Sequence, residues 1–484
     1  MSNDTTLTQY DDLLKDDADV AAIVIRERLR PVQGSRGVFF PPTFAGTGRS
    51  KSDYQIDRFA RADDPEGAQK EGVIANRCTV DSVPSQANRL EARLLEYSGT
   101  SIPKVTITGS RVGQGEINLL EVGHRVGDAV VRYSKNGDKD GFEPFEVALL
   151  AYVKGDAAPL ARLAPTSLVF GHWDSRDSAT RKSTKSKARR LIRSEIVAYN
   201  VQRVSKRSQY WSSIDPEVSH ELEQILKEAK EAAQEDPNTK NPASQLGMTD
   251  VPAPESPGGV IAFGPIERTA IIALSGVRAL AASEESTRVG VTEIDVDKTL
   301  RLRRYLFALA LASAAEPGVW DLREGCILVR ESRTDENKKV VADPLVFTAV
   351  TVKHSGQEEA FRVPTRIEAS EFLAKAAAAF FGEKEVDGKK APGIPPPLAL
   401  AFDPDGARAA VSTKSGGNVG EPKGRKDLVK ALGVLDAWKD KEAELQKKKL
   451  KELQKLWADA QKQPAADAAV ASDGDPTDDA GTES

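Results

Sequence analysis

The sequence predicts an α+β fold rather than a doubly wound sheet in which strands and helices alternate. A stripe of apolar residues at helical spacing runs through Ser82–Tyr97, and a second one runs through Leu300–Ala315. Strand-like runs rich in β-branched residues occur at Ile102–Ile107 and Val260–Leu280. Because the two kinds of pattern do not alternate regularly along the chain, they favour the α+β class.

The individual elements follow from apolar spacing and from residues that begin or end helices. Asp19–Arg30 is predicted to be a short helix that Pro31 stops, and Ser82 or Ser85 can cap the helix over Ser82–Tyr97. The other predicted elements are a strand over Val38–Phe44, a loop over Gly46–Gly72, apolar runs over Glu143–Ala151 and Ser167–Phe170, a helix or strand over Ala188–Val204, a charged helix over Pro216–Glu235, a loop over Asp236–Gly259, a strand pair over Val340–Val352 and a helix over Ala369–Phe381.

The chain is predicted to hold one large core between acidic ends. The predicted regions are an acidic N-terminal arm (1–19), a core with insertions (20–380) that contains a basic segment (176–207) and a helical insertion (216–258), a Pro/Gly-rich linker (381–426), a charged helix (427–463) and a disordered acidic tail (464–484). Within the linker, Leu398–Phe402 is apolar enough to dock on the core.

Composition excludes several classes of protein. At about 150 residues for each domain, the 484 residues allow roughly two to four domains. Cys78 and Cys326 are too few for a disulfide framework or a Cys-rich metal site. The N-terminus is polar and acidic, unlike a signal peptide, and no run approaches the ~18 apolar residues that span a membrane. We therefore expect a soluble cytoplasmic protein.

The formal charge of −5, from 68 Lys and Arg against 73 Asp and Glu, conceals an uneven distribution. Residues 1–20 and 464–484 together hold 12 acids and one base, so these ends carry −11 and the remaining chain carries +6. Residues 176–207 hold eleven bases against Asp177 and Glu195, which gives this stretch +9. Such a run indicates either a solvated loop or a surface for a polyanion, and the run alone does not decide between them.

Catalytic motifs are scarce in this chain. It contains no G-x-x-x-x-G-K-[ST] phosphate loop. The residue types of a hydrolase or a metal site come together at His172, Asp174, Ser175 and Asp177. The interpretation that we favour is that His172 and Asp174 satisfy backbone groups or each other. Asp81 and Asp128 could join them as metal ligands only if the fold gathers these side chains.

A second group of residues has the chemistry of RNA recognition. Ser85–Arg89 lies at a predicted helix start, where free N–H groups and the helix dipole favour an anion. The alternative is a surface helix in which Arg89 pairs with an acid. Aromatic side chains lie within or beside the basic segment, and this combination suits single-stranded nucleic acid, because cations follow the backbone and rings stack on bases. These aromatic residues are Trp173, Tyr199, Tyr210 and Trp211.

The candidate RNA-binding residues combine this helix, a short G-H-R-V-G-D-A-V-V-R element and the basic segment. They are Ser85, Gln86, Asn88, Arg89, His124, Arg125, Arg132, Trp173, Arg176, Arg181, Lys182, Lys185, Lys187, Arg189, Arg190 and Arg193. The chain has no aromatic RNP motif, so a standard RNA-recognition sheet is not indicated.

Several motifs in one order resemble a known family. They are Val38–Phe44 (VFFPPTF), Asp81–Glu91 (DSVPSQANRLE), Gly123–Ala129 (GHRVGDA), Ser167–Ser175 (SLVFGHWDS), Arg193–Ala198 (RSEIVA), Gly258–Val260 (GGV) and Arg304–Leu306 (RYL). Together they resemble the CRISPR-associated RAMP backbone subunit, the Cas-seven-like protein, of the type I-U (I-G) Cascade complex. The resemblance covers roughly residues 20–330.

The resemblance implies a modified ferredoxin-like (RRM-type) core with thumb- and web-like insertions. Such subunits polymerise head to tail along a CRISPR RNA and display its spacer for pairing with target DNA, which a recruited helicase–nuclease cuts. The implied partners are CRISPR RNA, the target strand, further copies of the chain, the large subunit and a fused Cas-five/Cas-six-like subunit. A scaffold of this kind needs no cofactor and is no enzyme.

The resemblance also implies roles for residues. The helix with Ser85, Gln86, Asn88 and Arg89 is similar to the S-x-Q helix that touches the RNA backbone in related subunits. Assigning Arg125 and the Arg181–Arg193 run to the RNA groove rests on charge. Two alternatives stay open: a metal-dependent nuclease that uses His172, Asp174 and Asp177 or Asp128, because type III relatives cleave RNA with an Asp, and a protein-interaction adaptor that uses residues 427–463.

Overall fold

The computed structural model describes most of the predicted core. The described residues are 5–45, 52–59, 75–111, 114–175, 183–206, 209–210, 251–252, 256–283, 294–314, 320–334, 340–341, 346–386 and 389–414, with single residues or short helical pieces within 217–228 and 429–456. The chain divides into two units, residues 1–176 with 183–403 and residues 177–182 with 404–484, which are described separately. None of the described helices is long and apolar enough to cross a membrane.

The predicted helix over Asp19–Arg30 is wrong, because Ala22–Pro31 forms strand β1. Ile23, Ile25 and Leu29 point into the core, and the arginines between them face outward. Apolar residues at two-residue spacing are the signature of a half-buried strand. The helix-like spacing of Val20, Ile23 and Val24 therefore gave the wrong period.

The main sheet has a ferredoxin-like order. Strands β1, β12 (Ile192–Tyr199), β17 (Ile266–Ala273) and β22 (Phe347–Val352) pair in the order β22–β1–β17–β12, and every neighbouring pair is antiparallel. Helix α3 (Val83–Ala92) lies in the chain between β1 and β12, and α11 (Val296–Ala314) lies between β17 and β22. This is a β-α-β-β-α-β core, so the predicted α+β class is confirmed.

Additional strands extend this sheet on both sides. They are β4 (Ile56–Arg58) and β5 (Asn76–Asp81) beyond β12, and β18 (Trp320–Arg323), β19 (Cys326–Arg330) and β23 (Glu358–Ala360) on the β1 side.

Helices α3, α11 and α12 (Arg366–Phe381) form the apolar layer of the core, as the sequence predicts. Ser82 caps α3, and its hydroxyl accepts a hydrogen bond from the Ser85 N–H. The α11 side chains from Tyr305 to Leu311 are completely buried. The ring of Tyr305 stacks on that of Phe380 with 5.1 Å between centroids, which joins α11 to α12.

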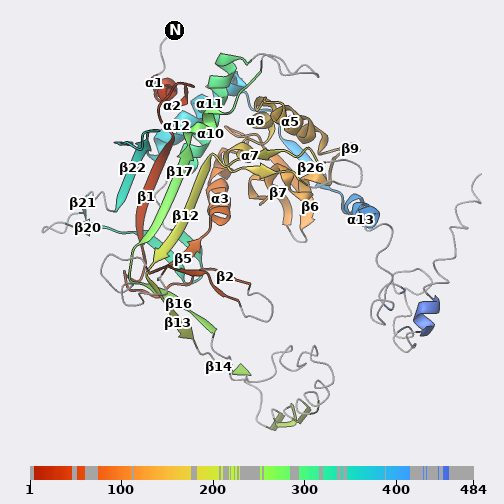
Figure 1. The fold of residues 1–484 in the computed structure, drawn as a ribbon. Coiled ribbons are helices and arrows are strands. Elements are labelled where there is room, and N and C mark those ends of the chain that lie inside the picture. The colour runs from red at the N-terminus through yellow and green to blue at the C-terminus, as the bar shows by residue number, and fades with distance from the viewer. Residues whose placement is uncertain are drawn as a thin grey trace, which may run out of the picture. The chain divides into compact units, whose positions relative to one another are not determined.

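A second sheet joins segments that are far apart in the chain (Figure 1). Its strands run in the order β7 (Gln114–Asn118), β6 (Val105–Arg111), β26 (Leu398–Phe402), β8 (Ser134–Asn136) and β9 (Lys139–Asp140). The apolar run at Leu398–Phe402 therefore docks between β6 and β8, as its sequence allows. The strand over Ile102–Ile107 is also present, with a later start at Val105.

An insertion separates β12 from β17. Among its described strands, β13 (Val201–Lys206) and β16 (Ser256–Ala262) pair with each other, and the chain bends between β12 and β13 at Asn200, which has φ of 49°. Figure 1 shows this pair continuing beyond the ends of β12 and β17, away from α10 (Leu274–Arg278) and α11. The predicted charged helix over Pro216–Glu235 falls largely outside the described residues.

The remaining described elements are short. They are α1 (Thr5–Thr8), α2 (Asp11–Leu14), β2 (Thr43–Phe44), β3 (Asp53–Tyr54), η2 (Arg93–Tyr97), η3 (Leu119–Glu121), η4 (Arg125–Gly127), α4 (Ala129–Arg132), α5 (Glu143–Val153), α6 (Ala158–Leu163), α7 (Thr166–Val169), β10 (His172–Trp173), β11 (Lys187–Ala188), β14 (Gln209–Tyr210), β15 (Val251–Pro252), β20 (Arg333–Thr334), β21 (Val340–Val341), β24 (Glu383–Val386), β25 (Lys389–Pro392) and α13 (Pro404–Lys414).

The acidic N-terminal residues pack on helix α11 in the first unit. Leu14 is completely buried, and the Asp11 carboxylate accepts two hydrogen bonds from the Arg304 guanidinium, at 2.6 and 2.5 Å. Arg303 pairs with Asp16 at 2.8 Å. In the described part of the arm, these acids are therefore partnered by arginines of α11 and not by the basic segment.

In the second unit, Leu432, Leu445 and Leu453 are buried in one hydrophobic cluster. The predicted helix over 427–463 falls largely outside the described residues and stays a prediction.

The main sheet buries an ion pair between two neighbouring strands. Glu27 of β1 lies opposite Arg268 of β17, and their side chains, both 1% exposed, pair at 2.8 Å. Arg330 of β19 also pairs with Glu27. One buried carboxylate thus compensates two guanidinium groups, and removing it would leave both without a counter-charge.

Glu27→Gln is therefore expected to lower the free energy of unfolding by about 3–5 kcal/mol, because it leaves buried arginine charge without a counter-charge. Arg268→Met should lower the free energy of unfolding by less, because Glu27 retains its ion pair with Arg330. The matched control is Arg26→Ala on the other face of β1, whose half-exposed pair with Glu358 should contribute less than about 1 kcal/mol. Urea unfolding measures all three, and equal losses for Glu27→Gln and Arg26→Ala would contradict the assignment.

Candidate nucleic-acid interface

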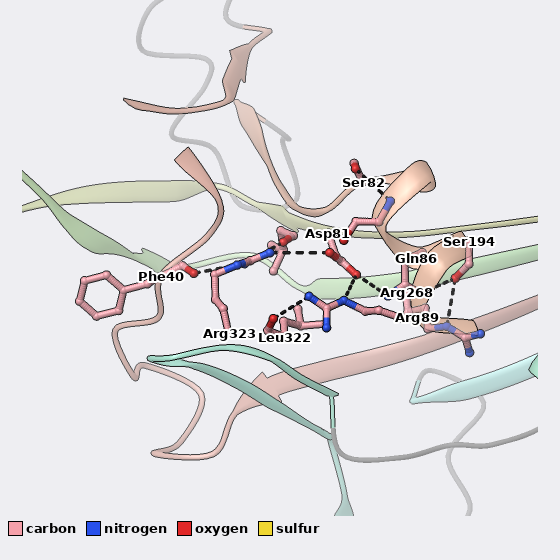
Figure 2. A network of polar contacts seen from close by, with 11 residues as sticks. Phe40, Asp81, Ser82, Gln86, Arg89, Ser194, Arg268, Leu322 and Arg323 are labelled. Carbon is pink, nitrogen blue, oxygen red and sulfur yellow. Dashed lines mark hydrogen bonds and ion pairs between the residues drawn. The ribbon is translucent and has the colours of Figure 1, made fainter. Parts of the chain in front are cut away.

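The predicted recognition helix begins at a buried carboxylate. Strand β5 ends at Asp81 and α3 starts two residues later, so side chains from the first turns of α3 reach back to it. Gln86 Nε2 donates to Asp81 Oδ2 at 2.6 Å, and Arg89 Nε donates to the same oxygen at 3.1 Å. Figure 2 shows these groups around Asp81, whose side chain is completely buried.

The network continues from Asp81 into the sheet in two directions (Figure 2). Toward β18, Arg323 approaches Asp81 Oδ1 at 3.7 Å, and Arg89 Nη2 donates to the Leu322 carbonyl at 2.6 Å. Toward β17, the Ser194 hydroxyl donates to Gln86 Oε1 at 2.8 Å and accepts a hydrogen bond from Arg268 Nε at 3.1 Å. These contacts link the Asp81 network to the Glu27–Arg268 pair.

The structure therefore divides the four predicted residues of this helix. Gln86 is completely buried and Arg89 is engaged with Asp81, which agrees with the alternative that Arg89 pairs with an acid. Ser85 is half-buried, and only Asn88 is exposed. Gln86 and Arg89 hold α3 on the sheet, and Asn88 lies on the surface beside Gly123.

Arg125, a second predicted contact, is also internal. Its guanidinium pairs with Glu91 of α3 at 2.7 Å, donates to the Gly171 carbonyl at 3.3 Å and lies over the Phe170 ring. Arg125 adopts φ of 53°, a conformation that few non-glycine residues accept. Burial raises the pKa of Glu91 from 4.5 to about 7, although the charge of Arg125 opposes the shift.

Arg132 is the third predicted arginine with an internal partner. It is buried and pairs with Asp174, which also accepts hydrogen bonds from the Thr184 N–H at 2.9 Å and the Thr184 hydroxyl at 2.6 Å. Burial would raise the pKa of Asp174, but the hydrogen bonds from Thr184 and Arg132 outweigh it and hold that pKa below its ordinary value. The ionised carboxylate thus fixes the loop at residues 183–186.

The interpretation that His172 and Asp174 satisfy their local surroundings is confirmed. His172 Nδ1 lies 3.2 Å from the Ser167 carbonyl, to which it can donate, and its Nε2 lies 2.7 Å from the Ser186 hydroxyl. Burial lowers the pKa of His172, which favours the neutral ring. Asp128 caps α4, so it does not join this pair. Asp177 lies outside the described residues, and among those described no three His, Cys, Asp or Glu side chains gather as metal ligands.

The exposed cations follow the Asp174 loop. Lys185, Lys187 and Arg189 point outward, and Ser186 and Ala188 between them are buried. We call Lys185, Lys187, Arg189, Arg190, Arg193 and Trp173 the basic strip. Across the β10–β11 ladder Trp173 lies opposite Lys187, and its indole is 69% exposed with the Lys187 ammonium 5.9 Å from the ring centroid.

The charges of the basic strip are largely uncompensated. In the described part of the chain, Lys185, Lys187, Arg189 and Arg190 have no acidic partner within 4 Å, and only Arg193 approaches one, Glu195 at 3.5 Å. Partial burial and the positive charges of Arg125 and Arg193 lower the pKa of Arg190. By contrast, three arginines on the outer face of the main sheet have acidic partners. These pairs are Arg26–Glu358, Arg28–Glu267 and Arg77–Asp57.

A cavity of about 380 Å³ adjoins the strip. Lys185, Lys187 and Arg189 line one side of it, and apolar or aromatic residues that include Tyr152 and Leu191 line the other. Such a surface offers cations for phosphates and an apolar wall for a base or a sugar. The sequence did not indicate the contribution of Tyr152, which comes from helix α5 and meets the strip only in the fold.

The exposed candidates form a continuous band. Asn88 lies beside Gly123, which precedes the exposed His124, and Gly127 packs against the Trp173 backbone. Trp173 then meets Lys187 of the strip. The structure thus brings Asn88, His124 and the strip together. Gln86, Arg125 and Arg132 are buried, and Arg89 is paired with Asp81. Arg176, Arg181 and Lys182 lie outside the described residues.

Part of the chain matches a known protein family. Residues 23–203 match the model of a family described as CRISPR-associated protein GSU0053. This segment contains β1, the Asp81–Arg89 helix start and the whole basic strip. This part of the chain is therefore similar to a CRISPR-associated family, which supports a role in CRISPR defence. A comparison with curated proteins finds no match.

Asp174→Asn is expected to loosen the loop at 183–186, because a neutral amide binds Thr184 and Arg132 more weakly. Hydrogen bonds to charged groups contribute about 1.5–3 kcal/mol, so hydrogen exchange of the Thr184 amide should accelerate roughly 10- to 100-fold. Asp128→Asn, at a different loop, is the control and should leave this exchange rate unchanged. Protection at Thr184 that survives Asp174→Asn would show that the carboxylate does not order the loop.

The Glu91–Arg125 pair predicts a pH dependence of stability. Because the folded pKa of Glu91 is about 7 and its unfolded value is near 4.3, folded Glu91 retains a proton that the unfolded chain releases. This group therefore makes the protein less stable as pH rises through that window, by at most about 1.4 kcal/mol per pH unit. Melting temperatures should fall more between pH 5 and 7.5 for the wild type than for Glu91→Gln. Parallel profiles of melting temperature against pH for the two proteins would contradict the raised pKa of Glu91.

Proposed function

We propose that the chain is the CRISPR RNA-binding backbone subunit of a type I Cascade complex of subtype I-U (I-G). The observation that carries the proposal is the basic strip, in which only Arg193 has an acidic partner among the described residues, and which lies on a ferredoxin-like core within the segment that matches the CRISPR-associated family. A cluster of exposed cations on a chain with a net charge of −5 is a place where a polyanion would bind.

The strip would hold RNA without reading its sequence. Lys185, Lys187 and Arg189 would contact successive phosphates, which fix position but carry no base information. Trp173 would stack on a base, a contact that tolerates any base because each has a π-face. The bases would then remain available for pairing with the target DNA strand, and pairing would supply the specificity.

The buried networks would make the strip rigid. Asp174 orders the loop that carries Lys185, and Arg125 ties α3 to Gly171 just before Trp173. Ordering these groups before RNA arrives reduces the entropy lost on binding. In this proposal the predicted contacts Gln86, Arg89, Arg125 and Arg132 act by positioning, and the exposed residues touch the RNA.

The chain would assemble head to tail along the guide, through a heterologous interface that does not close on itself. The strand pair β13–β16, which leaves the sheet between β12 and β17, is our candidate for the thumb-like element that meets a neighbouring copy. The large subunit, a fused Cas-five/Cas-six-like subunit and a recruited helicase–nuclease would complete the complex.

We further propose that the chain is a scaffold and not a nuclease. His172 and Asp174 are engaged in structural hydrogen bonds, and no observation favours catalysis by them. Labelled RNA and DNA incubated with the chain and Mg²⁺ or Mn²⁺ should stay intact. Cleavage that Asp174→Ala abolishes would overturn the scaffold role.

The triple variant Lys185→Ala/Lys187→Ala/Arg189→Ala is expected to weaken guide RNA retention irrespective of spacer sequence. Each phosphate contact to a single strand adds about 0.7 to the slope of log affinity against log salt, so the slope should fall by about 2. The matched control replaces Arg26, Arg77 and Arg366, which are exposed but ion-paired.

Salt titrations of RNA binding by the wild type, the triple variant and the control measure this effect. The proposal requires salt-sensitive binding by the wild type and a near-wild-type slope for the control. An unchanged slope in the triple variant would remove the strip from the interface.

A further inference from the structure

A second cavity, of about 300 Å³, lies at the opposite end of the central strands from the basic strip. The strip and its cavity adjoin Leu191, at the start of β12, whereas this cavity is lined by Ala262–Ile266, at the start of β17, and by Arg28–Pro31 of β1. Strand β12 has eight residues, so roughly 25 Å separates the two ends.

An exposed aromatic ring borders this cavity. Phe263 is 53% exposed and lies in the short bend between β16 and β17. The bend is held to the neighbouring chain segment by hydrogen bonds from the Phe263 N–H to the Asn200 carbonyl, at 3.0 Å, and from the Gly264 N–H to the Tyr199 carbonyl, at 3.1 Å. The ring is therefore presented to solvent on a fixed backbone, at the base of the β13–β16 pair.

The same cavity carries excess positive charge. Arg28, Arg30 and Arg36 line it, against Glu331 as the acidic lining residue. Arg28 pairs with Glu267 at 3.6 Å, but within the described residues Arg30 and Arg36 have no acidic partner within 4 Å. The Arg36 guanidinium lies 4.9 Å from the Phe263 ring centroid.

We propose that this cavity binds one nucleotide of single-stranded RNA, with its base stacked on Phe263 and its phosphates held by Arg30 and Arg36. Within the described residues neither guanidinium group has an acidic partner, and an exposed ring beside two such cations matches a nucleotide's flat base and its charge. An apolar peptide would leave the arginines unpaired, and a free phosphate would leave the ring unused.

The inference rests on the proposed function and deepens it. A strand held by the basic strip could reach Phe263 along the length of β12, so the two sites would grip one RNA at separate points. Arg30 and Arg36 lie inside the segment that matches the CRISPR-associated family, whereas Phe263 lies outside it, and the sequence alone did not indicate the site.

The test compares Phe263→Ala with Phe263→Trp in binding a single-stranded oligouridylate. One stack contributes about 1–3 kcal/mol, so Phe263→Ala should weaken binding about 5- to 100-fold, and Phe263→Trp should keep near-wild-type affinity. Phe59→Ala is the matched control, because Phe59 is 51% exposed but lies away from this cavity's lining, and it should have no effect. An oligonucleotide that carries 5-iodouracil should photocrosslink to the peptide that contains Phe263.

The outcomes separate this inference from the proposed function. If Phe263→Ala binds like the wild type and no crosslink forms there, while the basic-strip triple variant loses affinity, the nucleotide site is overturned and the RNA-binding function stands. If the wild type itself binds no RNA, both fall. An equal loss for Phe59→Ala would also overturn the site.

Discussion

The completely buried carboxylate of Asp81 is the constraint on which the rest of the structure depends. It accepts hydrogen bonds from Gln86 and Arg89 and lies near Arg323, so it ties α3 to β5 and β18. Through Ser194 the same network reaches the buried Glu27–Arg268 pair. A buried charge is tolerated only with partners, so these contacts specify one arrangement of α3 on the sheet.

The arginines of this chain fall into two groups, which differ in burial. Those with acidic partners in the core hold elements together, whereas among the described residues Lys185, Lys187, Arg189 and Arg190 of the basic strip have no acidic partner. The Asp174 carboxylate connects the two groups, because it pairs with buried Arg132 and orders the loop that carries Lys185. The acidic total of −5 therefore describes the molecule as a whole and not the surface on which we propose that RNA lies.

The sequence predicted α3, α11 and α12 because their apolar residues recur at helical spacing, and it predicted the fold class. It failed at β1, where the inward-facing Glu27 breaks the apolar pattern and its partner Arg268 lies 241 residues away. The sequence also failed to predict which candidate residues are exposed, for the same reason. Gln86, Arg125 and Arg132 look like free polar groups until the fold brings Asp81, Glu91 and Asp174 beside them. The alternation of Lys185, Lys187 and Arg189 with small residues, by contrast, can be recognised in the sequence.

The most direct test of the central claim is to identify nucleic acid that co-purifies with the chain when it is expressed together with a CRISPR array and its partner subunits. We expect RNA of one uniform, guide-sized length that high salt releases, because the proposed basic strip would hold phosphates without reading sequence. Protein that emerges free of RNA, or with fragments of random length and origin, would contradict it.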